Sequence, residues 1–210
     1  GSSGGLRGMK GQTWEGGFRV PMIARWLGKI PAGRVSHEPA GTIDLFSTVL
    51  KLAGVGLPDD RVIDGKDIMP VLASDAPSPH EALFSMSGTK LMTVRSGKWK
   101  LHVEKPPIWP KHLKGDWVDP RAPDGVTILA PCEQATPEDH PDVLTGDPAE
   151  PMMLFDLEAD RAEQHNVAQE HPEVVARLKS LFDENESGHY ERQDHRRTVP
   201  PEGRHAVPAP

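Results

Sequence analysis

The chain of 210 residues contains 22 prolines, 20 glycines and one cysteine, and its formal net charge is −7. This acidic balance, with no basic run longer than Arg196-Arg197, excludes a phosphate-backbone partner such as nucleic acid, and no apolar stretch approaches the length of a membrane-spanning helix. A single cysteine excludes an internal disulfide framework without settling the compartment, and the length allows one good core or two small ones.

The first stretch of the chain is rich in glycine and carries one lysine, Lys10. It reads Gly4-Gly5-Leu6-Arg7-Gly8-Met9-Lys10-Gly11-Gln12-Thr13-Trp14-Glu15-Gly16-Gly17-Phe18-Arg19-Val20-Pro21. Glycines permit tight turns, positive φ and the close approach of a ligand, so such a loop can carry a cation to a small anion. The spacing fits neither a P-loop nor a dinucleotide-binding loop. We therefore expect an anion other than a nucleotide phosphate.

Residues 17–75 are predicted to contain a strand followed by helices. The apolar run from Val20 to Trp26 indicates a buried strand, and the three- and four-residue spacing of apolar side chains between Thr42 and Ala53 predicts a helix that Gly54 ends. Residues 67–72 allow one short helical turn. This order is typical of the end of an α/β domain, and the change of composition at residues 74–79 marks an expected subdomain boundary.

The next part, residues 76–190, is predicted to be a small α+β subdomain with an antiparallel sheet. Strands are expected at 82–86, 90–95, 98–103 and 153–157, with a hairpin turn at Ser96-Gly97. In the third strand Trp99, Leu101 and Val103 alternate with Lys98, Lys100 and His102, which predicts one apolar face and one solvated face. A helix from Pro172 is expected to cover the apolar face with Val174, Val175, Leu178, Leu181 and Phe182.

Two segments lack any helical or strand period. Residues 104–151 are far longer than an ordinary connection, so this loop is either functional or poorly ordered, and Trp109 and Trp117 in it could stack on a sugar or aryl ring or pin the loop to the sheet. Residues 191–210 are expected to form a disordered tail, because they are polar and rich in proline.

The glycine-rich stretch closely resembles a late segment of the sulfatases, in the alkaline-phosphatase-like superfamily. The resemblance continues in order through residues 26–33, 43–46, 52–54, 64–67 and 154–157, and through a turn at 158–167 in which Arg161 replaces the usual proline. It covers most of the chain. It implies that residues 1–75 are the end of a sulfatase α/β catalytic domain and that residues 76–190 are its C-terminal α+β subdomain. Since that subdomain packs beside the active-site end of the main sheet in the resembling enzymes, and a long irregular segment runs over the surface, we expect the loop at 104–151 to lie at the rim of the substrate cleft.

The resemblance also implies a function, the hydrolysis of aryl or carbohydrate sulfate esters by an arylsulfatase-type enzyme. In the resembling enzymes the lysine at the position of Lys10 contacts a sulfate oxygen, so Lys10 is the expected catalytic and substrate-binding residue. An ammonium group in a partly desolvated pocket stabilises the charge that develops as the S–O bond breaks. The simpler alternative is a solvated loop lysine.

The catalytic centre that the resemblance implies is missing from the chain. Sulfatases carry a Cys-x-Pro-x-Arg signature, whose Cys or Ser matures to formylglycine, and Asp and Asn ligands for Ca²⁺, all upstream of the lysine loop. The only cysteine, Cys132, lies downstream and does not match. We therefore expect a C-terminal portion that is inactive by itself and has no metal ligands, with formylglycine and Ca²⁺ belonging to the full-length enzyme.

Other polar residues near the motif are expected to serve the fold. Arg7 and Arg19 could assist anion binding, but pairing with Glu15 or another carboxylate to hold the loop is the favoured role. Glu15 itself is expected to accept main-chain N–H bonds in a tight turn. His37 has no second ligand at metal spacing, which favours a structural or surface histidine.

Two alternative functions remain open at this point. One is a phosphonate or phosphodiester hydrolase of the same superfamily, which the residue at the upstream nucleophile position would distinguish. The other is a non-catalytic binding remnant. The expected partner is a small-molecule or sugar sulfate ester, and the resemblance implies a periplasmic, secreted or lysosomal location. The individual substrate and the oligomeric state are left open.

Overall fold

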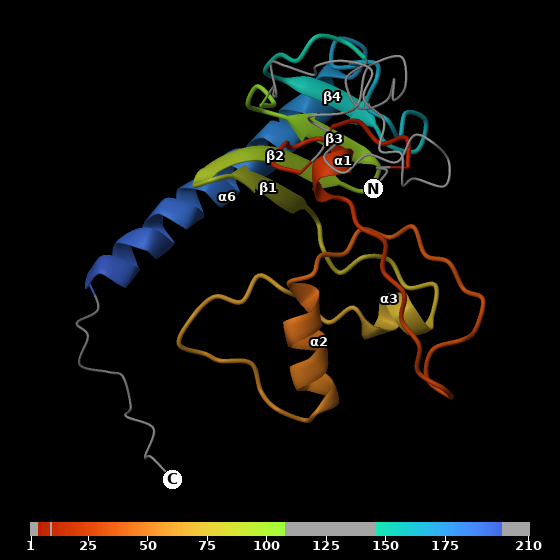
Figure 1. Cartoon of the computed structure of the whole chain (residues 1–210). Helices are drawn as coiled ribbons and strands as arrows, with labels where there is room; N and C mark the ends of the chain where they lie inside the picture. The colour runs from red at the N-terminus through yellow and green to blue at the C-terminus, as the bar shows by residue number, and fades with distance from the viewer. Residues whose placement is uncertain (1–3, 9, 108–145, 199–210) are drawn as a thin grey trace, which may run out of the picture.

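The computed structural model describes residues 4–8, 10–107 and 146–198. Figure 1 shows a sheet crossed by one long helix, and two shorter helices with long connecting segments that lie apart from the sheet. The elements are α1 (Glu15–Phe18), α2 (Asp44–Leu52), α3 (Met69–Ala73), β1 (Leu83–Ser87), β2 (Lys90–Ser96), β3 (Trp99–His102), β4 (Met153–Asp156) and α6 (Pro172–Thr198).

The four strands form one antiparallel sheet in the order β1-β2-β3-β4. The hairpin between β2 and β3 turns at Gly97, whose φ of 56° lies in the left-handed region that glycine adopts without strain. In the register, Val94 pairs with Leu101 and Leu101 with Leu154. The four strands predicted for residues 76–190 and their hairpin are confirmed.

Helix α6 covers one face of this sheet, as predicted. Leu178 and Phe182 of the helix are buried against the apolar side chains of the strands. The buried members of this core are Leu91, Val94, Leu101, Val103, Leu154, Leu178 and Phe182. No helix in the described ranges is long and apolar enough to cross a membrane.

The long helix continues into the range that was expected to be disordered. It ends at Thr198, whereas the tail was predicted to begin at residue 191. Glu191, Arg192 and Gln193 are good helix formers, so a polar composition does not stop a helix that is already nucleated. Residues 199–210 lie outside the described residues.

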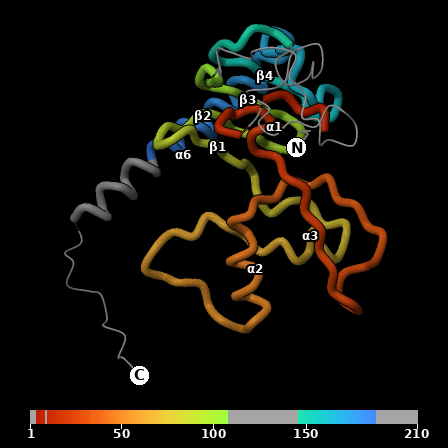
Figure 2. The backbone as a smooth tube through the Cα atoms, in the orientation of Figure 1, coloured from red at the N-terminus to blue at the C-terminus, as the bar shows by residue number. Residues whose placement is uncertain are grey.

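The prediction of a solvated second sheet face is wrong. Lys100 is 2% exposed and His102 is fully buried. The glycine-rich stretch covers this face, where Trp14 packs with Ala149, Met153, Phe155 and Leu157 in a second apolar cluster. The sheet is therefore covered on both sides, by α6 on one and by the glycine-rich stretch on the other (Figure 2).

The predicted buried strand at residues 20–26 is also wrong. This segment has no strand partner in the described ranges, and its apolar side chains are exposed, with Val20 at 65% and Ile23 at 94%. An extended apolar segment becomes a strand only where another strand satisfies its main-chain N–H and C=O groups. Such a partner is not available to it among the described residues.

The predicted helices α2 and α3 are present, but α2 turns its polar side inward. Asp44, Ser47 and Thr48 are buried, while the apolar residues Phe46 and Val49 are exposed. The buried side chains bind the segment that follows: Asp44 accepts from the main-chain N–H of Lys66 at 2.8 Å, and Ser47 donates to the carbonyl of Gly65 at 2.8 Å. These bonds hold α2 against residues 65–68 and leave its apolar side open.

Candidate functional site

The glycine-rich stretch forms a compact loop with Lys10 at its tip. The N–H of Gly16 donates to the carbonyl of Arg7 at 2.8 Å and closes the loop. Lys10 and Gly11 are exposed, whereas Leu6, Arg7, Gly8 and residues 12–15 are buried. We call residues 6–16 the lysine loop. The loop thus presents Lys10 to solvent while residues 6–8 and 12–15 are buried.

Glycine is required at Gly16 because the loop closes so tightly. A Cβ there would lie 2.4 Å from the carbonyl oxygen of Gly8 and 2.5 Å from that of Arg7. We expect Gly16→Ala to lower the free energy of unfolding by about 1–3 kcal/mol, since main-chain atoms would have to move. Chemical denaturation measures this change. Gly56→Ala is the control, because nothing lies within 4 Å of its Cβ position, and an equal effect of both substitutions would contradict the tight closure.

Arg7 ties the lysine loop to the end of the chain. Its guanidinium donates to the main-chain carbonyls of Glu163 and Asp147, both at 2.7 Å, and lies 3.8 Å from the centroid of the Trp14 ring. Burial lowers the pKa of Arg7 and outweighs the opposite effect of nearby carboxylates. The expected loop-holding role of Arg7 is thus found, although its hydrogen-bond acceptors are carbonyls rather than a carboxylate.

Beneath the loop lies a buried group of charged and polar side chains, Glu15, Lys100, His102 and Glu163, which we call the ionic cluster. The ammonium of Lys100 lies 2.9 Å from Glu15 Oε1 and 3.1 Å from Glu163 Oε1. His102 Nε2 lies 2.7 Å from Glu163 Oε1, and the main-chain N–H of Glu15 donates to Glu163 Oε2 at 2.5 Å. Glu15 therefore donates its N–H to Glu163, where it was expected to accept such bonds.

The electrostatics of the ionic cluster are those of a buried, paired site. Burial alone raises the pKa of the Glu163 carboxyl, but the Lys100 ammonium and the hydrogen bond with His102 outweigh it and lower that pKa to about 2. Burial lowers the pKa of His102 and dominates over the Glu163 carboxylate, which raises it. Near neutral pH the cluster thus holds ionised Glu163 and neutral His102, with the Nε2 proton of His102 donated to Glu163.

These shifts predict that acid destabilises the chain in two steps. The ordinary pKa of His102 is 6.5 and is lowered by folding, so below about pH 6.5 the unfolded state binds a proton that the folded state does not, and the free energy of unfolding falls. Glu163 adds a second fall between its ordinary pKa of 4.5 and its folded pKa of about 2. Each group contributes at most about 1.4 kcal/mol per pH unit.

Chemical denaturation between pH 7 and pH 4.5 tests the first step. We expect the slope of stability against pH to be smaller in His102→Gln than in the unaltered chain. His37→Gln should keep the original slope, since His37 is exposed. Equal slopes in all three proteins would show that His102 does not stay neutral on folding.

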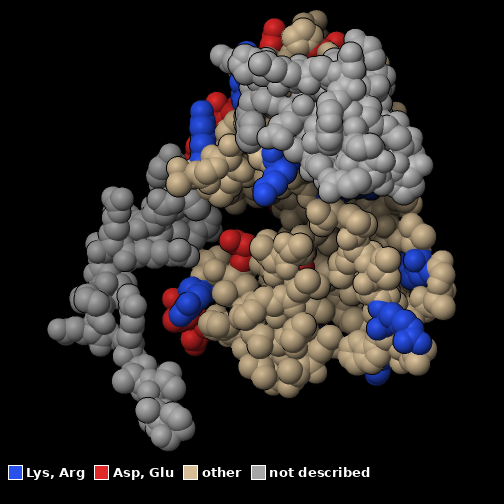
Figure 3. Space-filling model, viewed as in Figure 1, with Lys and Arg blue, Asp and Glu red and all other residues tan. Residues whose placement is uncertain are grey.

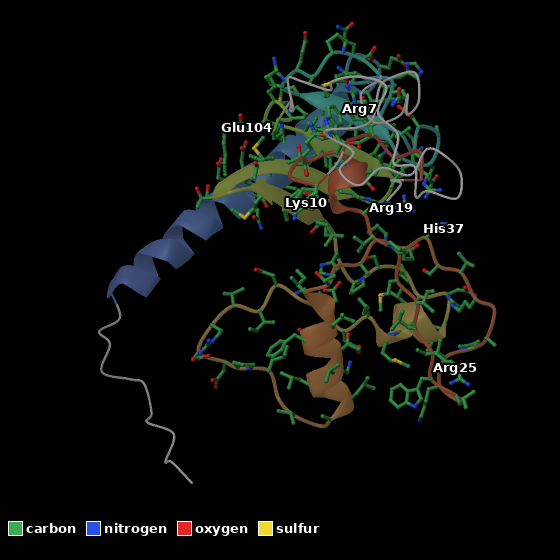
Figure 4. All side chains as sticks on the ribbon, in the orientation of Figure 1. Arg7, Lys10, Arg19, Arg25, His37 and Glu104 are labelled. Carbon is green, nitrogen blue, oxygen red and sulfur yellow. The ribbon has the colours of Figure 1, made fainter. Side chains whose placement is uncertain are left out.

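Most of the predicted polar residues lie on or near the lysine loop. Arg19 Nη1 lies 4.0 Å from Glu15 Oε2, in agreement with its expected pairing. His37 is exposed on the segment between α1 and α2, apart from Arg7 and α1 (Figure 4), as expected for a surface histidine. Lys10 makes no ion pair with any residue in the described ranges. Trp109, Trp117 and Cys132 lie outside the described residues.

The two described ends of the long loop meet the lysine loop. Gln12 Nε2 donates to the carbonyl of Pro107 at 3.1 Å, and Arg7 donates to that of Asp147. The prediction that residues 104–151 lie at the rim of a substrate cleft depends on positions 108–145, which are not described, and it stays a prediction.

Sequence reasoning missed Lys100, His102 and Glu163. The first two alternate with apolar residues, which signals the side of the sheet they share but not whether that side is covered. Glu163 lies in a polar turn. Its φ of 53° lies in the left-handed region, which a glycine in the sequence can indicate but a glutamate does not. One usable hint was the buried-looking position of Glu15 between Trp14 and two glycines, because a carboxylate in such a place needs a cation.

The described residues do not form the metal site that the family resemblance implies. No group of three or more His, Cys, Asp or Glu side chains in the described ranges could hold a metal ion. The sequence contains no Cys-x-Pro-x-Arg signature from which formylglycine could form. Among the residues that the structure describes, none therefore offers the ligand set that Ca²⁺ needs, and the sequence offers no precursor of formylglycine.

Comparison with known proteins gives the same family over both parts of the chain. Residues 1–55 match the sulfatase family model, and residues 78–195 match the model for the C-terminal region of aryl-sulfatase. Steryl-sulfatase from Mus musculus is 38% identical over 188 residues, which are 87% of this chain and 27% of that protein. Arylsulfatase from Hemicentrotus pulcherrimus is 34% identical over 184 residues, which are 87% of this chain and 32% of that protein.

A solved structure shows the same fold. The crystal structure of PsFucS1 sulfatase from Pseudoalteromonas sp. superposes with a TM-score of 0.64 at 23% identity, covering 89% of this chain and 33% of that one. The chain thus spans only part of these proteins, between 27% of the steryl-sulfatase and 33% of PsFucS1 sulfatase. Because the aryl-sulfatase C-terminal model alone spans more than half of the residues, the chain belongs to the sulfatase family.

Proposed function

We propose that this chain is the C-terminal portion of a sulfuric ester hydrolase of the arylsulfatase type, in which Lys10 binds the sulfate group and stabilises its charge during hydrolysis. The observation that carries this proposal is the presentation of Lys10: it is exposed, with Gly11, on a closed loop whose residues 6–8 and 12–15 are buried, in a chain of the sulfatase family. A solvated surface lysine would not need its neighbours to be fixed in this way.

The chemistry asked of Lys10 is electrostatic. Hydrolysis of a sulfate ester increases negative charge on the oxygens around the breaking S–O bond, and an ammonium held close to one of them lowers the energy of the transition state. Lys10 is exposed and makes no ion pair with the described residues, so its ammonium is available for a sulfate oxygen. The rest of an enzyme would close around it and supply the desolvation that strengthens this interaction.

The exposed apolar side chains support the proposal that residues 1–75 belong to a larger catalytic domain. Large hydrophobic side chains are exposed in numbers over residues 18–62, and Figure 3 shows a wide area without charges over α2 and its flanking segments. An apolar area of this kind marks a surface that packs against protein. Its members include Phe18, Val20, Met22, Ile23, Trp26, Leu27, Phe46, Val49 and Leu52.

We assign that covering role to the α/β portion of the relatives that lies outside their match with this chain. The family model for sulfatases matches residues 1–55, which carry most of the exposed apolar side chains. The segment at 20–26 would then find its strand partner, and the apolar side of α2 its cover, in that portion. Formylglycine and Ca²⁺ would be supplied by the same portion, since the described residues offer them no ligands.

A chimera tests this function. Hemicentrotus pulcherrimus arylsulfatase, with its matched segment replaced by this chain, should hydrolyse a chromogenic aryl sulfate, whereas the chain alone should not. The parent enzyme and a chimera truncated before the replaced segment serve as controls. A chimera that folds like the parent without turnover would contradict the proposal, and so would turnover by the chain alone above a Lys10→Ala control.

The substrate class and the location follow from the family and stay proposals. Aryl or sugar sulfate esters are the substrates we expect, in line with the relatives' names, and a secreted, periplasmic or lysosomal location is the one we infer for the whole enzyme. Turnover of aryl phosphate in place of aryl sulfate by the chimera would favour a phosphoester hydrolase instead.

A further inference from the structure

The lysine loop is held by residues from the far end of the chain. We propose that the ionic cluster fixes the position of Lys10 against its substrate, so that Glu163 and Lys100 of the C-terminal subdomain are positioning residues of the active site. This inference rests on the function proposed above for Lys10. It gives the C-terminal subdomain a part in catalysis, through the position of Lys10, in addition to its part in folding.

Glu163 holds both ends of the segment that carries Lys10. Its carboxylate accepts from the N–H of Glu15 at 2.5 Å, and its main-chain carbonyl accepts from Arg7 at 2.7 Å. Lys10 lies between these two anchored residues. Movement of Glu163 would therefore move both attachment points of the loop at once.

The backbone conformation of Glu163 is energetically unfavourable. Its φ of 53° lies in the left-handed region, which is unfavourable for a residue other than glycine or asparagine. The side chain is fully buried in spite of its charge. A glycine at this position would relieve the backbone but could not provide the carboxylate that Glu15, Lys100 and His102 bind.

The competing explanation is that the ionic cluster only stabilises the fold. Buried ion pairs are weak evidence for stability, because well-packed hydrophobic residues of similar size are often equally stable. Ionic hydrogen bonds are directional, however, and they fix the loop in one orientation. Catalysis is sensitive to that orientation, since a misplacement of about 1 Å can lower a rate about 10²-fold.

Two substitutions separate positioning from stability. Glu163→Gln keeps the shape of the side chain and removes its charge. The double variant Lys100→Met/Glu163→Gln removes one positive and one negative charge together and leaves Glu15 its contacts with Arg95 and Arg19. Lys98→Met is the matched control, because Lys98 lies on the same hairpin but pairs with Asp156 in a partly exposed position.

Hydrogen exchange on the 210-residue chain provides the first readout. We expect the amides of Glu15 and Gly16 to exchange about tenfold faster in Glu163→Gln and in the double variant, while amides of β2 and β3 in the sheet core keep their rates. Lys98→Met should change neither set. Unchanged exchange at Glu15 and Gly16 would overturn the inference, and so would equal acceleration throughout the core.

A double-mutant cycle in the chimera provides the second readout. The double variant should lower kcat/KM by about 10- to 10²-fold per folded enzyme, but it should cause no further loss when Lys10→Ala is already present. A purely structural effect would add to that of Lys10→Ala, and this result would overturn the inference. If Lys10→Ala by itself leaves kcat/KM unchanged, the proposed function fails instead, whatever the exchange data show.

Discussion

Lys100→Met, made alone, should lower the free energy of unfolding by about 3–5 kcal/mol, because it leaves the buried Glu163 carboxylate without its cation and removes the nearest cation from Glu15. Lys100 is 2% exposed and lies within 3.1 Å of both Glu15 and Glu163. Methionine has a similar volume, so the loss comes from unpaired charge rather than from a cavity. Chemical denaturation at neutral pH measures the change, and Glu163 should then titrate at a higher pH than in the unaltered chain.

The control for this effect is Lys98→Met. Its salt bridge with Asp156 is 2.6 Å long but partly exposed, and exposed pairs contribute only about 0–1 kcal/mol. A similar loss from both substitutions would mean that the ionic cluster is hydrated and weakly coupled. The burial of Lys100 and Glu163 would then not make the loss of their pairing costly in free energy of unfolding.

Local signals in the sequence were sufficient for the C-terminal subdomain. The hairpin is defined by two alternating strands around Ser96-Gly97, and α6 by apolar residues at helical spacing after Pro172. The turn at Gly97 and the strands beside it are adjacent in the sequence, so their pairing needs no distant segment. Sequence reasoning succeeds where local preference and tertiary packing agree.

The failed predictions concern contacts between distant segments. Alternation in β3 placed Lys100 and His102 on one side of the sheet correctly, but nothing local indicated that the lysine loop covers that side. Glu15 and Glu163 are 148 positions apart, and only the folded chain shows their hydrogen bond. The strand expected at 20–26 failed for the related reason that a strand needs a partner.

Lys10 was identified by family resemblance and not by local physics. Its residue type, charge and glycine neighbours are compatible with an anion site, but they are equally compatible with a solvated turn. What the structure adds is the contrast between the exposed pair Lys10 and Gly11 and the buried residues 6–8 and 12–15 of the same loop. That contrast gives the resemblance a physical basis, because the loop is fixed while its cation is free of the described carboxylates.

Lys10→Ala in the chimeric arylsulfatase should lower kcat/KM by about 10²-fold or more, which is the loss expected when one charged contact to the transition state is removed. Stability should change little, since Lys10 is exposed and supports no buried contact. Lys10→Arg should retain part of the activity, because the charge remains although its geometry differs. Lys29→Ala, at another exposed lysine in a turn, is the matched control and should leave kcat/KM unchanged.

The most direct measurement is the ratio of kcat/KM for a chromogenic aryl sulfate between the chimera and its Lys10→Ala variant, with both rates expressed per folded enzyme. We expect a ratio of about 10² or more, together with equal denaturation midpoints for the two proteins. A ratio near 1 would contradict the central role of Lys10, and a loss of activity that merely follows a loss of folded protein would contradict it as well.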